Sequence, residues 1–400
     1  MRKVFRLKGH IQHYAWGGQK YIPKLLGIEP KDTPYAEYWL GAHENAPSLV
    51  ETAEGEISLD TFLKGNPRSF LGTEVDQNFG RLPFLFKVLD VKQMLSIQVH
   101  PTKPEAEKGF KKENELGIPL KASHRNYKDD NHKPEIMVAL GDFWLLHGFL
   151  PREDLLKVLR NNKEFSSLVT IFLKKGYKGL YQYVMELPFE ESDAILIPLI
   201  RRNLPLYKKN KLDKNSPEYW ASKAVMQENK ESQLDKGIFS IYFFNILKVS
   251  KGEAVFQDAG VPHAYLEGQN MELMANSDNV LRGGLTPKHV DVSELLKHVI
   301  FEETKPKILK GNTLGNNIEQ VYRTPAPDFE LSSLNIGLED EYSGEASSIE
   351  IYIVMEGQAE VKENKTSIAL KKGDSFMALS EAKFKISSPD KAILYKATTP

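Results

Sequence analysis

The spacing of apolar residues along the chain predicts an N-terminal region built from short strands. Up to about residue 150, short apolar runs alternate with turn residues, which is typical of β-structure. The stretches "GRLPFLFKVLD" (80–90) and "MLSIQVH" (94–100) are strand candidates separated by a turn. A third strand-like region, "HKPEIMVALGDFWLLHGF" (132–149), is broken at Gly141-Asp142.

One of these strands has an unusual face. In "LSIQVHP" (95–101) the apolar residues alternate with Ser96, Gln98 and His100. Because side chains alternate across a strand, the three polar groups share one side of it. A polar row so close to the apolar run "LPFLFKVL" requires an explanation other than ordinary core packing.

Helical spacing begins near Pro151. In "PREDLLKVLRNN" (151–162) a proline stands at the helix start and acids occupy the first turn, and in "SPEYWASKAVMQ" (216–227) Ser216 is the expected N-cap before Pro217. We predict a helical insertion over 151–235. The segment "GIFSIYFFNILKV" (237–249) is apolar on both alternating faces and is predicted to be a strand buried on both sides.

A second β region is expected from about residue 320. Short strands separated by turns such as Glu356-Gly357 and Lys372-Gly373-Asp374 favour a sandwich or jelly roll. The region aligns loosely with "VSKGEAVFQDAGVPHAYLEG" (249–268), because both stretches carry Lys-Gly-acid and an aromatic before a turn. Only the earlier stretch has a histidine after the turn, His263, so we expect no metal and no catalytic residue in the later one.

The composition is that of a globular protein and disfavours some partners. The chain has 400 residues, of which 41% are hydrophobic and 27% charged, so two or three domains are expected. Lys and Arg number 53 against 54 Asp and Glu, which gives no reason to expect nucleic acid or a membrane as partner. The chain has no Cys, which excludes disulfides and thiolate metal ligands. Without a signal-peptide pattern or a membrane-spanning apolar run, we expect a cytoplasmic protein.

Four polar side chains could together form one metal site. Gln98 and His100 share a strand face, Glu135 follows in "NHKPEIM", and His263 follows a proline in "VPHAY". Two imidazoles, a carboxylate and an amide oxygen suit Zn²⁺, with Mn²⁺, Co²⁺ or Fe²⁺ as alternatives. The spacing alone leaves a second interpretation open, in which the two histidines are unrelated residues with hydrogen bonds of their own.

Four longer motifs resemble the type I mannose-6-phosphate isomerase family. They are "PYAEYWLGAHENAPS", "FLFKVLDVKQMLSIQVHPTK", "DDNHKPEIMVAL" and "GIFSIYFFNILKVSKGEAVFQDAGVPHAYLEGQNMELMANSDNVLRGGLTPKHVDV", in the family's order. The resemblance implies a mainly β fold: a cupin-type jelly-roll β-sandwich catalytic domain with a helical insertion and a C-terminal β-sandwich domain. It also implies a metal-dependent interconversion of mannose 6-phosphate and fructose 6-phosphate, with one Zn²⁺ per chain.

The resemblance lets domains and site residues be assigned. We expect a discontinuous catalytic domain (1–150 and 236–318), the helical insertion (151–235) and a degenerate cupin-like C-terminal domain (319–400). The implied metal ligands are Gln98, His100, Glu135 and His263. The implied catalytic residues are Arg282, Lys133, His132, Asp278 and Glu272. The implied substrate contacts are Ser96, Lys288 and Trp16.

Several roles within this set stay open. Arg282 suits either an enediolate or a phosphate, and Lys288 is the second candidate for the phosphate. The base that removes the carbon proton is one of Lys133, His132, Glu272, Asp278 or a zinc-bound water. Simpler interpretations are a structural ion pair between Arg282 and Asp278, plain surface charge for Lys288, and a serine bonded to the backbone for Ser96.

Two other functions are compatible with a cupin fold. One is a non-catalytic sugar-phosphate-binding or regulatory protein, which the complete donor set and Arg282 disfavour. The other is a metal-dependent oxygenase, which the amide ligand and the phosphate-suited basic residues disfavour. For the isomerase we expect a small sugar phosphate as the ligand and a monomer or a weak homo-oligomer.

Overall fold

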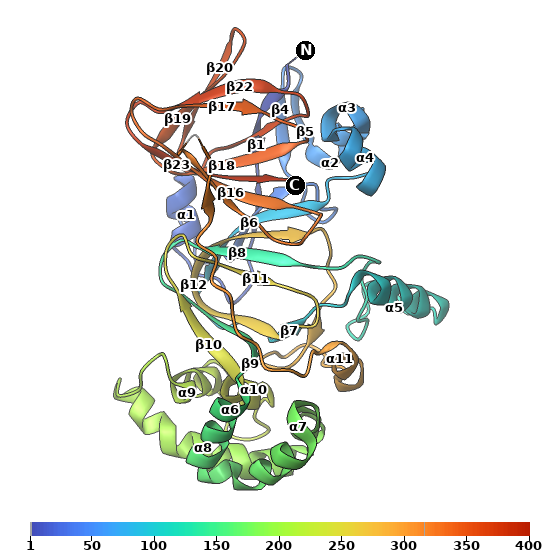
Figure 1. Cartoon of the computed structure of the whole chain (residues 1–400), viewed down its shortest axis with the longest axis vertical. Helices are drawn as coiled ribbons and strands as arrows, with labels where there is room; N and C mark the ends of the chain where they lie inside the picture. The colour runs from blue at the N-terminus through green and yellow to red at the C-terminus, as the bar shows by residue number, and fades with distance from the viewer. Residues whose placement is uncertain (1, 316) are drawn as a thin grey trace.

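The protein is elongated, with helices at one end and β-sheets along the rest of its length (Figure 1). The structure is a computed structural model and describes residues 2–315 and 317–400. None of the helices within these residues has the length and apolar character needed to cross a membrane. The predicted fold class, mainly β with a helical insertion, is confirmed.

The middle of the molecule is a branched ten-stranded sheet. Its longest strand, β12 (His263–Ala275), pairs with β7 (Gln98–Val99) and β9 (Phe143–Phe149) at its first residues and with β6 (Phe84–Val91) and β8 (Glu135–Ala139) further along. β12 therefore has paired neighbours along both halves of its length. The other strands are β2 (His10–Gln12), β3 (Glu37–Gly41), β10 (Phe244–Val249), β11 (Ala254–Gln257) and β13 (Leu281–Arg282).

Helices cover one end of this sheet and form the predicted insertion (Figure 1). They are α6 (Arg152–Asn161), a short 3-10 turn (Lys163–Phe165), α7 (Ser166–Glu186), α8 (Phe189–Lys208) and α9 (Pro217–Glu228). Ser216 is the N-cap residue of α9, as predicted, although its hydroxyl makes no capping hydrogen bond. Trp220 of α9 packs in one continuous core with Val99 and Leu146 of the sheet, so the insertion and the sheet share their hydrophobic interior.

The segment 237–249 was predicted wrongly as a single strand. It forms the helix α10 (Gly237–Phe243), followed directly by β10. All seven residues of α10 are buried, so the pattern contains no polar side whose period could distinguish a helix from a strand. Packing of α10 residues such as Phe239 and Tyr242 into the helical core decides the conformation.

The other end of the molecule consists of two packed sheets (Figure 1). The nine-stranded sheet contains β1 (Val4–Lys8), β4 (Leu49–Thr52), β5 (Gly55–Ser58), β14 (Asn312–Thr313), β15 (Glu319–Tyr322), β16 (Glu330–Ile336), β18 (Glu350–Glu356), β21 (Ser375–Ala378) and β23 (Ala392–Thr398). The four-stranded sheet contains β17 (Glu341–Glu345), β19 (Gln358–Glu363), β20 (Thr366–Lys371) and β22 (Lys383–Ser387).

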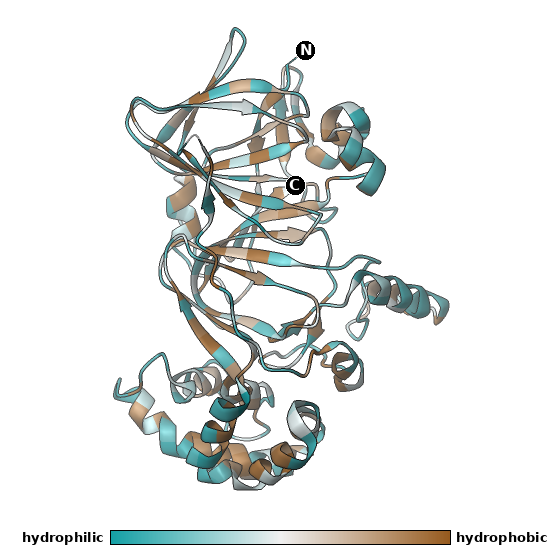
Figure 2. Cartoon of the chain, in the orientation of Figure 1, coloured by the Kyte–Doolittle hydropathy of each residue, from teal (hydrophilic) through white to brown (hydrophobic). Residues whose placement is uncertain are grey.

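Alternate residues of the nine-stranded sheet enter two different cores. Ile351 packs with Phe86 of the ten-stranded sheet, whereas its neighbour Tyr352 packs with Ile386 of the four-stranded sheet. The nine-stranded sheet is therefore the middle layer between the other two. Figure 2 shows the resulting apolar stretches along the central strands.

The nine-stranded sheet combines the two ends of the chain. β1 pairs with β21 in the register Phe5↔Met377, and β4 and β5 extend the same sheet. Sheet membership thus crosses the expected boundary between a catalytic domain that begins at residue 1 and a C-terminal domain that begins at 319. The domain boundaries themselves stay a prediction.

The remaining helices are short except for one. They are α1 (Tyr21–Leu26), α2 (Leu59–Lys64), α3 (Pro67–Leu71), α4 (Thr73–Phe79) and α11 (Val292–His298). The longer α5 (Lys103–Glu115) projects from the middle of the molecule and is largely hydrophilic (Figure 2). It begins with a capping box between Thr102 and Glu105, two residues after His100.

Candidate metal centre and active site

One row of the ten-stranded sheet carries several predicted site residues. His263 of β12 lies opposite Gln98 of β7, and Gln98 lies opposite Arg282 of β13. On the other side of β12, His263 lies opposite His147 of β9. Directly opposed residues of antiparallel strands project to the same face. The sheet register therefore places Arg282 on the same side as two expected metal ligands, although they come from distant parts of the sequence.

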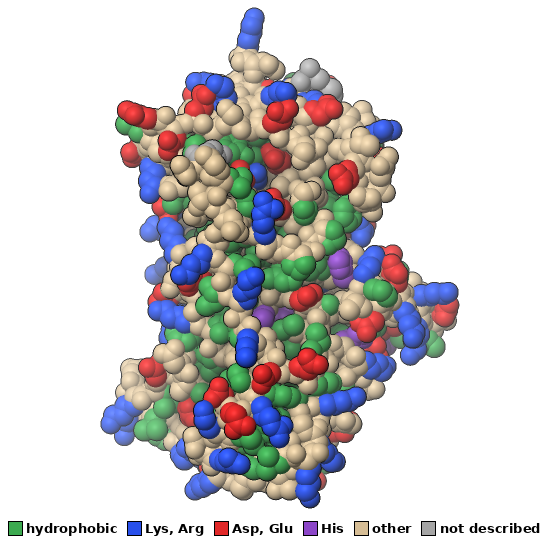
Figure 3. All heavy atoms as spheres, in the orientation of Figure 1, with side chains coloured by type: hydrophobic (Ala, Val, Ile, Leu, Met, Phe, Trp, Pro, Cys, Tyr) green, Lys and Arg blue, Asp and Glu red, His purple; other side chains and the backbone are tan. Residues whose placement is uncertain are grey.

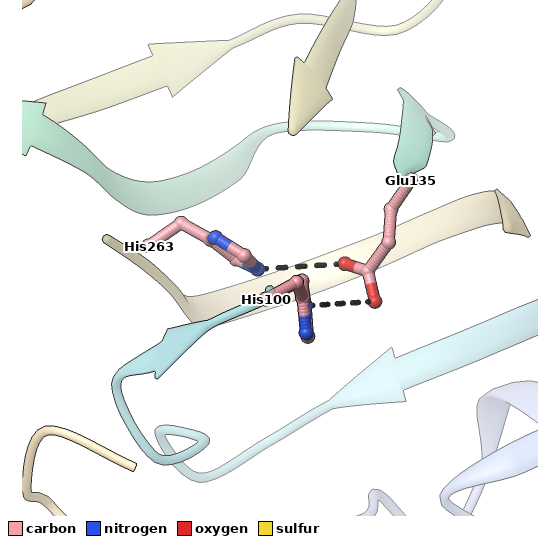
Figure 4. A group of neighbouring side chains, drawn as sticks. All are labelled: His100, Glu135 and His263. Atoms are coloured by element: carbon pink, nitrogen blue, oxygen red, sulfur yellow. Dashed lines mark ion pairs between the residues drawn. The ribbon is translucent and has the colours of Figure 1, made fainter. Parts of the chain in front are cut away.

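Three buried side chains converge beside this row. His100 follows β7, Glu135 begins β8 and His263 begins β12, as Figure 4 shows. The His100 Nε2 atom lies 3.3 Å from Glu135 Oε1, and the His263 Nε2 atom lies 3.5 Å from Glu135 Oε2. The three residues are at most 4% exposed. The structure thus brings three of the four expected ligands into one group.

The hydrogen bonds of the two imidazoles fix which nitrogen faces Glu135. His100 Nδ1 donates to the Asn279 carbonyl at 2.8 Å, and His263 Nδ1 donates to the Val261 carbonyl at 2.9 Å. Carbonyl oxygens only accept, so in the neutral rings each Nε2 carries a lone pair. Both Nε2 atoms are buried, and neither has a hydrogen-bond partner among the described residues.

The charges of the group favour binding of a cation. Burial lowers the pKa of His100 to about 4, so this ring is neutral at pH 7. Burial alone would raise the pKa of Glu135, but the charge of Lys133 beside it holds that pKa well below its usual value. The Nε2 lone pair of the neutral His100 ring therefore faces an ionised carboxylate, and a cation between them would turn this repulsion into attraction.

The spacing of the group fits zinc. Ligand atoms about 2.0–2.1 Å from a tetrahedral zinc ion are separated from each other by about 3.3–3.4 Å. The two nitrogen–oxygen distances of 3.3 and 3.5 Å match that separation. Gln98 lines the same small cavity as Glu135 and His263 and is placed to supply a fourth ligand.

Charged side chains near the second half of β12 also line this cavity. Lys87 of β6 lies opposite Glu272 of β12, with its Nζ atom 3.1 Å from Glu272 Oε2 and 3.4 Å from Glu37 Oε2. Lys133 reaches Glu135 Oε1 at 3.1 Å. The two carboxylates raise the pKa of Lys87 despite its burial, whereas burial raises the pKa of Glu272. The cavity therefore holds both cationic groups and a carboxyl group suited to proton transfer.

Lys87 and Glu37 were missed in the sequence, although one pattern could have revealed them. Lys87 is the single charged residue of the apolar run "FLFKVL", and all eight residues of β6 are buried. A buried lysine requires carboxylate partners. Glu37 in "EYWLG" supplies one of them, but its pairing with β6 depends on sheet topology.

Two predicted catalytic residues lie beside the cavity rather than in its lining. Asp278 is 3.3 Å from His43 Nε2, and both residues line a larger cleft next to α2, α3 and α4. Burial alone would raise the pKa of Asp278, but the bond to His43 and nearby lysines lower it. His132 is bonded through Nε2 to Asp328 at 2.8 Å, in the turn before β16. The alternative pairing of Arg282 with Asp278 is wrong, because the segment between them is not helical and Asp278 pairs with His43.

The remaining predicted residues surround the site at different distances from the metal group. No described carboxylate lies within ion-pair distance of Arg282, and burial lowers its pKa. Burial and the charge of Arg282 also lower the pKa of Lys288. Ser96 is half-buried, and Trp16 stacks on Tyr14 and packs against the apolar cluster below the cavity. Figure 3 shows histidine side chains among charged residues in the middle part of this face.

Comparison with known proteins identifies the family. Residues 4–152 match the model of the phosphomannose isomerase type I catalytic domain. The mannose-6-phosphate isomerase of Salmonella typhimurium is 38% identical over 92% of this chain and 93% of its own length, and that of Escherichia coli is 37% identical over 94% and 95%. The chain belongs to the type I phosphomannose isomerase family. An Arabidopsis thaliana mannose-6-phosphate isomerase is 30% identical over 99% of the chain and 93% of its own.

Solved phosphomannose isomerase structures have the same fold. A zinc-bound mannose 6-phosphate isomerase superposes with a TM-score of 0.90 at 34% identity, with full coverage of both chains. The Salmonella typhimurium enzyme bound to fructose 6-phosphate and zinc superposes with a TM-score of 0.89 at 33% identity, again with full coverage. These likenesses confirm the expected cupin-type fold of the family and the agreement along the whole chain.

Proposed function

We propose that the chain interconverts mannose 6-phosphate and fructose 6-phosphate at a zinc ion held by Gln98, His100, Glu135 and His263. The observation that carries the zinc assignment is the pair of buried, unpartnered Nε2 atoms that face the ionised Glu135 at the spacing of a tetrahedral ion. Membership of the phosphomannose isomerase family and a zinc-bound relative with the same fold support the reaction and the metal.

The zinc ion would supply a Lewis acid that polarises the sugar carbonyl and holds its neighbouring hydroxyl. The carbonyls of Asn279 and Val261 keep the two histidines in the tautomer that presents Nε2 to the metal. Lys133, which contacts Glu135, remains a donor at the edge of the metal group. Burial of His100, Glu135 and His263 lowers the local dielectric constant, which strengthens these electrostatic interactions.

The isomerisation transfers a proton between C2 and C1 of the open-chain sugar through a cis-enediol or enediolate. Among the candidates for the base, Lys133 and Glu272 line the cavity. The raised pKa of Glu272 brings it toward neutral pH, where a carboxyl group exchanges protons most effectively. We therefore favour Glu272, with its position held by Lys87. His132, which is bonded to Asp328, and Asp278, which is paired with His43, are less suited.

Arg282 is the proposed stabiliser of negative charge on the enediolate oxygens. It lies in the same row as Gln98 and His263, and its guanidinium has no carboxylate partner among the described residues. Lys288, whose pKa the charge of Arg282 lowers, is the proposed phosphate contact, and Ser96 and Trp16 are proposed to line the substrate site. A sugar phosphate carries charge that keeps it from crossing membranes unaided, which supports the expected cytoplasmic location.

The proposal is tested by an activity assay combined with metal analysis. Purified protein should contain about one divalent ion per chain and form fructose 6-phosphate from mannose 6-phosphate in a coupled assay. A chelator should abolish turnover and Zn²⁺ should restore it. His100→Ala should lose both zinc and turnover, whereas the same change at the exposed His124 should alter neither.

Three results would contradict the proposal. Full activity in protein shown by elemental analysis to be metal-free would exclude the zinc assignment. Sugar-phosphate binding without turnover in zinc-loaded protein would favour the non-catalytic binding protein. Uptake of oxygen by the loaded protein would favour the oxygenase. A monomer or weak homo-oligomer stays a prediction, which size measurements in solution would check.

A further inference from the structure

Two segments that lead into active-site residues are joined by a dense set of hydrogen bonds. Residues 128–131 lead into Lys133 and Glu135, and residues 276–279 lead into Arg282. The bonds centre on two side chains, the carboxylate of Asp129 and the amide of Asn279. Asn279 is 1% exposed, so its amide is sealed inside the protein. We call these two side chains and their bonds the Asp129–Asn279 clamp.

The Asp129 carboxylate accepts from both segments. Its Oδ1 atom accepts from the Asn131 N–H at 2.9 Å, the Ser277 hydroxyl at 2.8 Å and the Asn279 amide at 3.2 Å. Its Oδ2 atom accepts from the Asp278 N–H at 2.7 Å. Every contact of this carboxylate is a donor, so an acceptor-only side chain is required at position 129.

The Asn279 side chain completes the connection in the reverse direction. Its Oδ1 atom accepts from the N–H groups of Lys128 and Asp129 at 2.7 and 3.2 Å. Its Nδ2 atom donates to the carbonyls of Asp129 and Asn131 at 2.7 and 2.9 Å. Both ends of the amide are therefore satisfied by the opposite segment.

The main chain of Asn279 extends these bonds to the metal group. Its carbonyl oxygen is the acceptor for His100 Nδ1, at 2.8 Å. His100 comes from a third part of the chain, after β7. One residue thus fixes the tautomer and the orientation of a metal ligand with its backbone, while its side chain locks the segment before Lys133.

We propose that Asp129 and Asn279 are positioning residues that couple metal binding at His100 to the placement of Lys133 and Arg282. The proposal rests on the proposed zinc site. With the clamp closed, the His100 ring presents its lone pair to the metal and the two catalytic segments are held at a fixed separation. When these bonds are broken, the Asn279 carbonyl is no longer held against His100 Nδ1, and the two segments are no longer fixed relative to each other.

The coupling works in both directions. A partner that stabilises one arrangement of a protein is itself bound more tightly by that arrangement. Zinc at His100 should therefore protect the backbone N–H groups of 128–131, and opening of the clamp should weaken zinc binding. Loss of an outer hydrogen-bond partner of a metal ligand typically lowers metal affinity by about 10- to 100-fold.

Asp129→Asn is the sharpest test because it keeps the shape of the side chain. An amide nitrogen at either terminal position would direct N–H groups at donors, either at the Asp278 N–H or at the three donors around Oδ1. The matched control is Asp142→Asn, the same substitution in an exposed turn, where Lys248 is the one ion-pair partner of the carboxylate among the described residues. Zinc affinity is measured without sugar, by competition with a fluorescent zinc chelator.

We expect Asp129→Asn to bind zinc about 10- to 100-fold more weakly than the wild type and the control, in protein whose circular dichroism shows it folded. In hydrogen exchange, zinc should slow exchange across 126–134 in the wild type and the control but not in Asp129→Asn. Unchanged zinc affinity together with unchanged zinc protection would overturn the proposal.

Kinetics supply a further readout. In zinc-saturated Asp129→Asn, kcat should fall more than KM rises, because Lys133 and Arg282 are displaced while binding groups remain. If Asp129→Asn does not fold, Ser277→Ala removes one donor to the same carboxylate and should weaken zinc binding about fivefold. An unchanged affinity in folded Ser277→Ala would then count against the clamp. A wild type that binds zinc but lacks isomerase activity would defeat the proposed function and leave the zinc-based tests of the clamp intact.

Discussion

The chemistry of the site comes from polar side chains at inward positions of apolar strands. Lys87 lies inside the fully buried β6, Gln98 stands in β7 between the buried Ile97 and Val99, and Glu135 begins the buried β8. Buried charges are tolerated only with partners or a metal ion. Lys87 and Glu135 therefore each have charged or imidazole neighbours, and substitution of one member of such a pair leaves the other uncompensated.

Replacement of Arg282 separates a catalytic role from a binding role. Arg282→Ala should lower kcat by about 10²–10³, because charge develops on the enediolate oxygens only as the proton leaves carbon. KM should change less, since ground-state binding is less affected. Steady-state kinetics of folded, zinc-loaded Arg282→Ala and Arg282→Lys are the measurement, with Arg160→Ala in α6 as an exposed control. A strong rise in KM at near-normal kcat would show that Arg282 holds the phosphate.

His147 should make the metal-free protein sensitive to acid. Burial lowers the pKa of His147 from 6.5 to about 4. Between these values the unfolded chain binds a proton that the folded chain does not, so stability is complete above pH 6.5 and is lost as the pH falls. The loss is about 1.4 kcal/mol per pH unit, or ~3 kcal/mol in all.

Urea unfolding of chelated protein at pH 7.5 and pH 5 measures this effect. His147→Gln should lose about 2 kcal/mol less unfolding free energy than the wild type over that interval. The same substitution at exposed His124 should leave the pH dependence as it is in the wild type. An identical pH dependence in His147→Gln and the wild type would show that His147 is not the titrating group.

At the scale of elements, the helical insertion and the sheet are parts of one core. Trp220 of α9 is fully buried, its ring centroid lies 5.7 Å from that of Trp144 in β9, and its indole N–H donates to the Lys214 carbonyl. Leu281, next to Arg282, belongs to the same core. The insertion therefore supports the strand row that carries the site.

Trp220→Ala should destabilise the whole protein rather than the insertion alone. Removal of a buried tryptophan typically costs about 3–5 kcal/mol through lost burial and the cavity it leaves. Because the core is continuous, urea unfolding followed by circular dichroism and by zinc release should still show one shared transition at lower denaturant. Separate transitions for the two signals would contradict a common core. Leu173→Ala, at an exposed position of α7, is the control.

At the scale of the whole molecule, the nine-stranded sheet connects the two ends of the chain. The register of β1 with β21 joins Val4 to Ala378 and Leu7 to Ser375, and Phe5 and Leu7 pack in the core shared with the ten-stranded sheet. The C-terminal strands thus complete a sheet that begins with the first residues of the chain. His132 adds a polar contact between the active-site segment and Asp328 of the C-terminal part.

Truncation after residue 318 should consequently prevent folding. The truncated chain would expose the apolar face that packs against Ile351 and Met377 and would leave β1 without its partner β21. We expect aggregated protein without zinc binding, as judged by size-exclusion chromatography and metal analysis. A monomeric, zinc-binding product that unfolds cooperatively would show that the catalytic part is independent of the C-terminal strands.

Local patterns were sufficient for much of the architecture. The apolar run at 84–90 predicted β6, and the break at Gly141-Asp142 predicted that 132–149 divides into two strands, β8 and β9. The Ser216-Pro217 start predicted α9. Turns, caps and apolar runs are properties of neighbouring residues, so local patterns reveal them. The same logic failed at 237–249, where a uniformly apolar segment has no period. Of the site, the sequence supplied the donor types, and resemblance supplied their grouping.

By itself, the sequence determined which chemistry is available: no thiolate, two histidines and a glutamate for a metal, and a single lysine within an apolar strand. The tertiary structure decided which of these groups meet. Register across β9, β12, β7 and β13 brings His263, Gln98 and Arg282 to one face, and β3 gives Lys87 its second carboxylate. The physical reason is that strand pairing joins residues more than a hundred positions apart, and no local pattern records which strand will be the neighbour.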